Sequence, residues 1–407
     1  MRLREELVQV YRAALTSLDL GARVFDALPP RPPRAFSASV VAVGKAAPAM
    51  AAGALERWSP FLERVLVIAP DGVECKMTDP RVEVLRAPHP LPDARSIQAA
   101  VRAVDVARDA RGLVLALVSG GASSLLCSPC EGLSLDEKRE VIATLLSSGA
   151  SIREINMVRR HISRLKGGGL TCAAAPTHTL AFLASDVIGG AACDVGSGPT
   201  VPDPTTCADA RAVLLHRARR FRSLPMRETL KPGDPEASLQ KVRTIASPDD
   251  LARAAAERLK AEGFSVRLFE AATFDVATMA SEYRALASEL GTGEAVVRAA
   301  EPLLDMGATK PGRGGRAGHL ATALAHTLPD DVAFLAGASD GVDGTSDAAG
   351  AVIDADFCSE IDETRCDEAL RHFDTACLHE DAGTALPGGH TGLNLCDLHI
   401  LARAKKK

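Results

Sequence analysis

The first half of the 407-residue chain alternates between short apolar runs and segments rich in helix-forming residues. Five of the apolar runs have the length and the aliphatic content of buried strands: SVVAVGK, RVLVIAP, VEVLRAP, LVLALVSG and HTLAFLAS. Helix-like segments lie between them, for example at residues 92–110 and 133–148. Because such alternation is typical of a parallel sheet with helices on both faces, we predict an α/β fold.

The regular pattern weakens between residues 219 and 249, where proline, glycine and charged residues accumulate. The second half then has its own strand-like runs, FSVRLF, EAVVRAA and DVAFLAG. A chain of this length commonly forms two domains. We therefore place the domain junction in this region and predict domains at residues 1–235 and 236–407.

Composition excludes several classes of protein. The hydrophobic content of 46% and charged content of 24% are those of an ordinary soluble globular protein. The net charge is −5, aromatic residues make up 3%, and basic residues cluster only in the last three positions, so nucleic-acid binding is not expected. The first twenty residues are typical of an amphipathic helix, no run is long enough for a membrane span, and the ten cysteines are scattered. These features predict a cytoplasmic protein with reduced thiols and no membrane partner.

Small residues follow two of the predicted strands in the first half. SGGASS follows the run at 113–118, and Lys45 directly follows Gly44 at a strand-to-helix turn. Glycines let a ligand approach the backbone closely, and a lysine there can reach an anion at the start of the next helix. A simple tight turn explains SGGASS equally well, and a surface lysine explains Lys45. The candidate ligand contacts in this loop are Ser119, Gly120, Gly121, Ala122 and Ser123.

A third segment, residues 184–206, is long, rich in glycine and nearly free of large side chains. Asp186 lies at the end of a predicted strand, where a carboxylate can act on a bound ligand. Gly198 and Thr200 suggest a second anion-binding loop. An ordinary surface loop would carry more charged residues, so we favour a functional interpretation.

The second half carries a basic segment and an acidic segment, each next to glycines. KPGRGGRAGH places Arg316 among Gly314 and Gly315 just before a predicted helix, an arrangement that suits phosphate or a solvated basic turn. GASDGVDGTSDAAGA places Asp340 and Asp343 after a buried run. Clustered carboxylates suggest Mg²⁺ or the hydroxyls of a polar substrate, whereas Asp-Gly turn chemistry is the simpler explanation.

Several familiar motifs are absent from the sequence. There is no P-loop, no strand followed by G-x-G-x-x-G, and no H-E-x-x-H pattern. Cys127 and Cys130 form a lone C-x-x-C without a second ligand pair, so zinc is not expected. Anion-binding segments in both halves suggest a cleft between two domains, and phosphoryl transfer needs lysine, arginine, carboxylate and metal in such a place.

The motifs occur in a recognisable order: VAVGKAAPAM, APHPLPDARS, LVSGGASSLL, SIREINMVRRHISRLKGGGL, SDVIGG, GSGPTVPDPTT, GRGGR, SDGVDGTSDAAGA and TGLNLCDLHI. Over nearly the whole chain this set resembles the glycerate kinase family that carries a MOFRL domain, some of whose members are labelled hydroxypyruvate reductases. The resemblance implies a Rossmann-like N-terminal domain with a three-layer parallel sheet. It also implies a C-terminal α/β domain of MOFRL type, with the active site in the cleft between the two domains.

The resemblance further implies ATP-dependent phosphorylation of the 2-hydroxyl of D-glycerate, giving 2-phosphoglycerate and ADP with the help of Mg²⁺. Lys45, Asp186 and Arg316 match the expected catalytic positions. Lys45 would neutralise phosphate or carboxylate charge, Asp186 would orient or deprotonate the attacking hydroxyl, and Arg316 would stabilise the transferring phosphoryl group. Asp340 would hold the metal or a substrate hydroxyl. Arg159 and Lys166 are expected as further anion contacts.

The chain departs from the family pattern in two places. Ala317, Gly318 and His319 stand where relatives commonly have Asn-Gln-Glu, and Gly190 stands where an acidic residue is often found. Both changes remove polar groups beside expected site residues, so metal coordination or substrate preference can differ. Two other readings stay open: an oxidoreductase acting on hydroxypyruvate, and a non-catalytic homologue that binds a small molecule. His161 is expected to be structural, and a homodimer is among the expected assemblies.

Overall fold

The chain forms two compact units in a computed structural model that describes residues 2–33, 36–307 and 309–406. The continuous unit is Leu20–Ala246, and the split unit combines the residues up to Asp19 with those from Ser247 onward. This division differs from the predicted one at residues 1–19 and 236–246. The physical reason for the first difference is that helix α1 (Leu3–Ser17) packs on α10, β9 and β10 of the split unit.

The continuous unit is built on a six-stranded parallel sheet with the order β3-β2-β1-β4-β5-β6. This is the strand order of a Rossmann fold, in which the winding direction changes between β1 and β4. Both of these strands are buried along their whole length, because their side chains are aliphatic on both faces. The strands are β1 (Ala38–Val43), β2 (Leu62–Pro70), β3 (Val82–Ala87), β4 (Leu113–Val118), β5 (His178–Ala184) and β6 (Gln240–Ala246).

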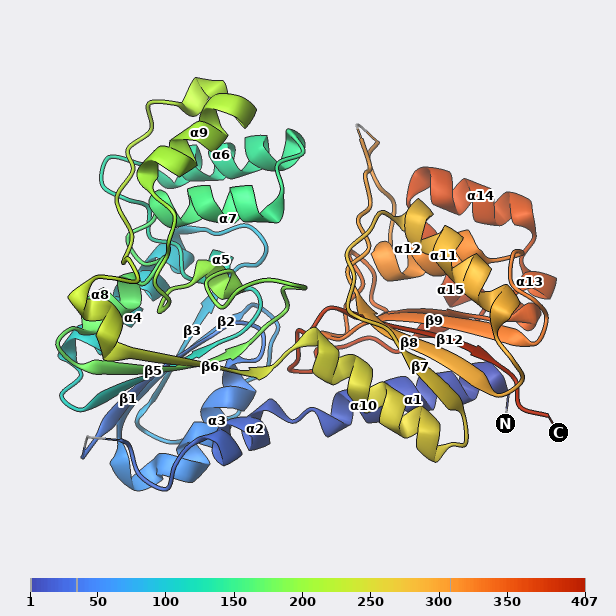
Figure 1. Cartoon of the computed structure of the whole chain (residues 1–407), viewed down its shortest axis with the longest axis horizontal. Coiled ribbons are helices and arrows are strands. Elements are labelled where there is room, and N and C mark those ends of the chain that lie inside the picture. Colours follow the sequence, from blue (N-terminus) through green and yellow to red (C-terminus); the bar gives the residue numbers. More distant parts are fainter. Residues whose placement is uncertain (1, 34–35, 308, 407) are drawn as a thin grey trace. The chain divides into compact units, whose positions relative to one another are not determined.

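Helices cover both faces of this sheet (Figure 1), with α2 and α3 on one face and α4, α5 and α8 on the other. Three further helices, α6, α7 and α9, pack around a separate apolar core. The helices are α2 (Leu20–Ala27), α3 (Ala47–Trp58), α4 (Ala94–Asp109), α5 (Ala122–Leu125), α6 (Leu135–Ser147), α7 (Ile152–His161), α8 (Gly169–Ala174) and α9 (Cys207–Arg217).

The split unit has a mixed six-stranded sheet with the order β11-β10-β9-β12-β8-β7, in which only β7 and β8 pair in parallel. Helices α1 and α10 cover one face, and α11 and α12 cover the other (Figure 1). Strand β12, the last in the sequence, lies in the middle of the sheet. The strands are β7 (Ser265–Leu268), β8 (Glu294–Ala300), β9 (Val332–Ala338), β10 (Gly350–Ile353), β11 (Ala385–Leu386) and β12 (Asp397–Arg403). The helices besides α1 are α10 (Pro248–Ala261), α11 (Val276–Glu289), α12 (Arg316–Leu324), α13 (Ala355–Glu360), α14 (Glu363–His372) and α15 (Thr375–Asp381).

The predicted fold class, a two-domain α/β protein with a parallel N-terminal sheet, is confirmed. The five predicted strands of the first half are β1 to β5, and the three of the second half are β7 to β9. The predicted helices at 92–110 and 133–148 are α4 and α6. Among the described residues, no helix combines the length and the apolar character needed to cross a membrane.

Candidate active site

Two of the predicted loops meet where β1 and β4 end. Gly44 has φ +124°, and a Cβ on it would lie 2.1 Å from Ser119 Oγ, so only glycine allows the loops to approach this closely. The Lys45 N–H donates to the Gly120 carbonyl at 2.9 Å. The buried Ser119 hydroxyl accepts from the Ala46 N–H at 3.1 Å, so this side chain joins the two loops.

Lys45 and Asp186 lie on either side of the SGGASS loop. A Cβ built on Gly121 would lie 3.6 Å from Lys45 Cγ and 3.2 Å from His89 Cδ2, so both side chains flank this glycine. Asp186 is half-buried and follows β5, the strand next to β4. Because β1, β4 and β5 are parallel, their carboxyl ends bring these residues to the same edge of the sheet. His89 was not predicted from the sequence as a site residue.

A chain of polar contacts extends from this loop into α7. The Ser123 and Ser197 hydroxyls lie 2.8 Å apart, and the Ser197 hydroxyl donates to Asn156 Oδ1 at 3.2 Å. Arg159 Nη1 donates to the same Asn156 oxygen at 3.3 Å. Lys166 Nζ donates to the carbonyl of Gly196, the neighbour of Ser197, at 3.1 Å. The structure therefore brings the predicted Arg159 and Lys166 to the SGGASS side of the unit.

Gly198 and Thr200 hold their loop against the segment before α8. The Gly198 carbonyl accepts from the Gly168 N–H at 2.8 Å, and the Thr200 carbonyl accepts from the Thr171 hydroxyl at 3.0 Å. Thr200 itself is buried. Through these hydrogen bonds, the backbone of both residues fixes the position of the loop. Beside this loop, a Cβ on Gly190 would lie 2.4 Å from Val187 Cγ1, so a larger residue at 190 requires Val187 to move.

In the split unit, Arg316 opens α12 and contacts two carboxylates. Its Nε lies 2.9 Å from Asp397 Oδ2, and its Nη1 lies 2.8 Å from Glu301 Oε1. Burial alone would lower the pKa of Arg316, but Asp397 and Glu301 outweigh it and raise the pKa above its usual value. Glu301 follows β8 and the buried Asp397 opens β12. Neither was predicted, although Asp397 stands in the TGLNLCDLHI motif.

Two further aspartates belong to this group. The Asp343 carboxylate accepts from the Ala317 N–H at 3.1 Å and the Gly318 N–H at 2.8 Å, and so caps α12. Burial raises the pKa of Asp343 to about 7, with Asp397 adding to the rise and the two N–H groups opposing it. Asp340 is half-buried and accepts from the Val342 N–H at 3.1 Å. Its charge adds to that of Asp397, whose pKa is raised by burial first and then by Glu301 and Asp340.

The other predicted residues around α12 support this arrangement. The Gly314 N–H donates to Thr345 Oγ1 at 3.2 Å, and a Cβ on Gly315 would lie 2.1 Å from Asp343 Oδ1. His319 stacks on Phe373 with ring centroids 5.4 Å apart. Burial lowers the pKa of His319 to about 4, so the ring is neutral at physiological pH. The departure from the family pattern at this position therefore places an uncharged aromatic ring in the core.

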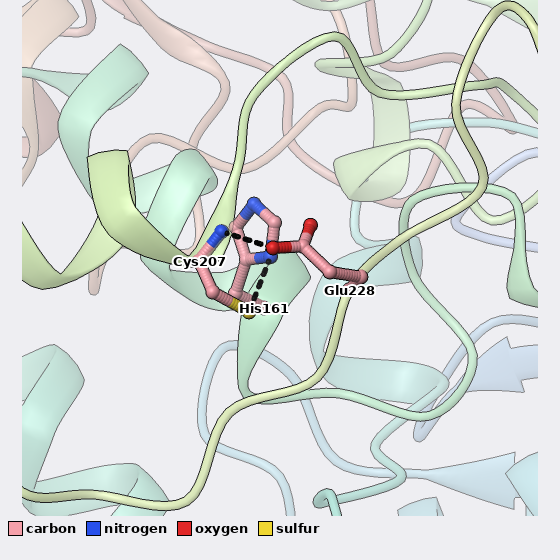
Figure 2. A group of neighbouring side chains, drawn as sticks. All are labelled: His161, Cys207 and Glu228. Atoms are coloured by element: carbon pink, nitrogen blue, oxygen red, sulfur yellow. Dashed lines mark hydrogen bonds between the residues drawn. The ribbon is translucent and has the colours of Figure 1, made fainter.

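One group of potential metal ligands lies beside the end of the 184–206 segment, where His161 contacts Thr205. Figure 2 shows His161, Cys207 and Glu228, whose donor atoms lie within 4.8 Å of one another. The Lys231 ammonium already pairs with Glu228 at 2.8 Å. Burial, with a smaller contribution from Glu228, raises the pKa of the Cys207 thiol to about 11, and a thiol must lose its proton to bind a metal. We therefore assign this group a structural role.

Comparison with known proteins agrees with the architecture. The sequence model of the MOFRL family matches residues 290–397. A second family model, described as a domain of unknown function (DUF4147), matches residues 6–227. The crystal structure of glycerate kinase from Thermotoga maritima aligns with a TM-score of 0.84 at 27% identity, covering 98% of this chain and 99% of that chain. Fold and site thus define a two-domain α/β protein with a MOFRL domain.

Curated relatives narrow the class to a family. D-glycerate 2-kinase from Thermotoga maritima is 31% identical over 89% of both chains, and human glycerate kinase is 30% identical over 89% of this chain and 83% of the relative. A protein from Agrobacterium vitis with the provisional name hydroxypyruvate reductase is 33% identical over 98% of this chain and 94% of its own. The chain belongs to the glycerate kinase family, as the ordered motifs of its sequence predict.

Proposed function

We propose that this protein is an ATP-dependent glycerate 2-kinase that converts D-glycerate to 2-phosphoglycerate and ADP. The names of its relatives support this assignment. The observation that carries it is the grouping of Lys45, the SGGASS loop and Asp186 at the carboxyl edge of β1, β4 and β5. In open α/β sheets ligands bind at this edge, where the strand order reverses.

The charges at this edge suit phosphoryl transfer. In the proposed step, the 2-hydroxyl oxygen of D-glycerate bonds to the γ-phosphorus of ATP while the bond to the β-phosphate oxygen breaks and ADP leaves. Asp186 would orient the hydroxyl and accept its proton, which passes on to solvent. Lys45 would neutralise negative charge on a phosphate or on the glycerate carboxylate.

To Arg316 of the split unit we assign the stabilisation of charge on the transferring phosphoryl group. A guanidinium held by Asp397 and Glu301 is fixed in orientation, so it can stabilise charge on the transferring group without rearranging. Glu301 and Asp397 contact Arg316, and Asp340 acts on Asp397, so several hard oxygen donors lie near one another, which fits Mg²⁺. Asp340 and Glu301 are the residues that would hold it, since Asp343 is committed to capping α12. When bound, Mg²⁺ would neutralise charge on the phosphate oxygens.

The loop after β1 does not favour hydroxypyruvate reduction. In dinucleotide-binding Rossmann folds this turn carries three glycines that admit the pyrophosphate. Here Gly44 is followed by Lys45, Ala46, Ala47 and Pro48. All ten cysteines are free thiols, which supports a cytoplasmic location.

A coupled assay tests the proposed reaction. The purified protein is mixed with ATP, Mg²⁺ and D-glycerate, together with enolase, pyruvate kinase and lactate dehydrogenase but no phosphoglycerate mutase. Enolase accepts the 2-phosphate and not its 3-isomer, so glycerate-dependent NADH oxidation that needs enolase supports the 2-kinase. Glycerate-dependent ADP release without a product that enolase accepts would indicate phosphorylation of the other hydroxyl. In a separate mixture without the coupling enzymes, NADH oxidation with hydroxypyruvate would support a reductase instead.

Asp186→Asn tests the role of the carboxylate. We expect turnover to fall by roughly 100- to 10,000-fold, because amide nitrogen and oxygen cannot accept the hydroxyl proton. The unfolding midpoint should stay close to that of the parent protein. Asp136→Asn is the matched control, since this side chain lies on α6 and is 90% exposed. Unchanged turnover in a folded Asp186→Asn protein would contradict the role assigned to Asp186.

A further inference from the structure

Three basic side chains converge in the interior of the continuous unit. Lys138 on α6 is only 5% exposed, and its Nζ has no hydrogen-bond partner in the described part of the chain. Lys166 is 3% exposed and donates to the Gly196 carbonyl. Arg159 on α7 is half-buried and donates to Asn156. We call these three side chains the cation group.

The charges of the cation group act on one another. Burial lowers the pKa of all three side chains. The charge of Arg159 lowers the pKa of Lys138 further, and Lys138 and Arg159 together do the same to Lys166. The acidic groups facing them are the thiols of Cys127 and Cys130. Thiols are weak acceptors, and burial raises the pKa of Cys130, so this thiol is uncharged at neutral pH.

The neighbouring residue Arg160 is also a buried cation, but carboxylates balance its charge. Its guanidinium is 5% exposed and lies 3.2 Å from Asp194 Oδ1 and 3.1 Å from Asp203 Oδ2. Among the residues that the structure describes, no member of the cation group forms such an ion pair. Burying a charge is costly unless a partner of opposite charge is present. Among the described residues, the cation group therefore lacks a carboxylate that would balance its charge.

We propose that Lys138, Arg159 and Lys166 receive an oxyanion group of the substrates, either a nucleotide phosphate or the carboxylate of the hydroxy acid. The ammonium and guanidinium groups match this chemistry, and the Ser123 and Ser197 hydroxyls lie on the same hydrogen-bonded path through Asn156. Arg159 and Ser123 are half-buried, so solvent reaches the group on this side. The assignment rests on the proposed kinase function and adds Lys138 to its binding residues.

Binding and stability are linked in this arrangement. Without the anion, the cation group destabilises the fold; with the anion bound, the same charges stabilise it. Lys138→Met removes the charge but keeps an aliphatic side chain. We therefore expect the unliganded variant to be at least as stable as the parent protein, while its affinity for the oxyanion falls by about 10- to 100-fold. Lys241→Met, an exposed lysine on β6 of the same unit, is the matched control.

The test measures dissociation constants by titration calorimetry with three probes: ADP, inorganic tripolyphosphate and D-glycerate. Weaker binding of ADP and tripolyphosphate in Lys138→Met supports the site and makes its ligand a phosphate. Weaker binding of D-glycerate alone supports the site and makes its ligand the carboxylate. Unchanged affinities for all three probes, or a parent protein that binds none of them, overturn the proposal.

A second variant and a parallel activity assay complete this test. Arg159→Gln changes a half-buried side chain, and it decides the question by the same criteria if Lys138→Met does not fold. The coupled kinase assay is run on the parent protein in parallel. Binding that depends on the cation group in a parent protein without turnover refutes the proposed kinase and leaves the anion site standing. Turnover in the parent with unchanged affinities in both variants refutes the anion site alone.

Discussion

Each unit contains a group of like charges, and the two groups differ in sign. In the continuous unit, three basic side chains lie together without a carboxylate among the residues described. In the split unit, the carboxylates of Glu301 and Asp397 contact the Arg316 guanidinium, whose charge also acts on Asp343, and Asp340 acts on Asp397. A core selected only for stability would pair these charges within each unit. Under the proposals above, the cation group of the continuous unit receives an oxyanion, and the carboxylates of the split unit hold a cation.

Arg316→Met should have the largest effect, because it removes the cation that Asp397 and Glu301 contact in the split unit. We expect turnover to fall by about 1,000-fold, as for other arginines that stabilise a transferring phosphoryl group. The free energy of unfolding should fall by about 3 kcal/mol, since Asp397 is left buried and unpaired. Steady-state kinetics and urea denaturation measure the two effects.

Arg313→Met is the control for this change. Arg313 belongs to the same glycine-rich segment and pairs with Glu380 at 2.9 Å, but its side chain is 46% exposed. Exposed ion pairs contribute about 1 kcal/mol or less. If the two variants lose activity to the same extent, the special role of Arg316 is contradicted.

Asp343→Asn should change how stability depends on pH. A carboxyl with a folded pKa of about 7 instead of 3.8 binds a proton on folding, so the parent protein loses stability as pH rises from about 4 to 7. This difference in pKa corresponds to up to about 4 kcal/mol. Asparagine does not titrate, so the variant should lack this part of the loss.

The measurement is urea denaturation of both proteins at pH 5 and pH 8. The gap in stability between parent and variant should shift in favour of the variant at the higher pH. A gap that is the same at both pH values would contradict the raised pKa. It would also weaken the view that the split unit holds an excess of buried carboxyl groups.

Tyr11→Phe should have the smallest effect and confine it to the split unit. The Tyr11 hydroxyl donates to the Ala338 carbonyl at 2.6 Å, and losing this buried bond costs about 1 kcal/mol. Hydrogen exchange should become faster in α1 and β9. Amides of β1 and β4 in the continuous unit provide the internal control, and faster exchange there would contradict the division into two units.

Much of the framework could be predicted from the sequence. Largely aliphatic runs identify β1, β2, β4 and β5, because inner strands of a parallel sheet are buried on both faces. The turn after β1 and the SGGASS loop after β4 were predicted separately, and parallel pairing of the two strands brings them together. Gly44 and Lys45 were informative because close approach and anion binding require particular residue types.

The sequence did not reveal residues whose roles depend on distant neighbours. Lys138 resembles any lysine on an amphipathic helix, and only packing between α6 and α7 shows that its charge is buried. Asp397 and Glu301 are brought to Arg316 by the order of strands in the second sheet. That sheet is mixed, and local residue patterns do not determine strand order. The docking of α1 on the split unit is a contact of the same kind, far apart in the sequence.

Because the split unit combines segments from both ends of the chain, it affects the order in which the two units can fold during synthesis. Every strand of the continuous unit comes from one stretch of chain, so this unit can fold while the ribosome is still translating. Helix α1 is synthesised early, yet Tyr11 on this helix bonds to Ala338, which is synthesised 327 residues later. Strand β12 comes later still and fills the middle of the sheet with Asp397 at its start. A nascent chain therefore contains the whole continuous unit long before Asp397 is synthesised, and a chain that ends before β12 lacks one of the two carboxylates that contact Arg316.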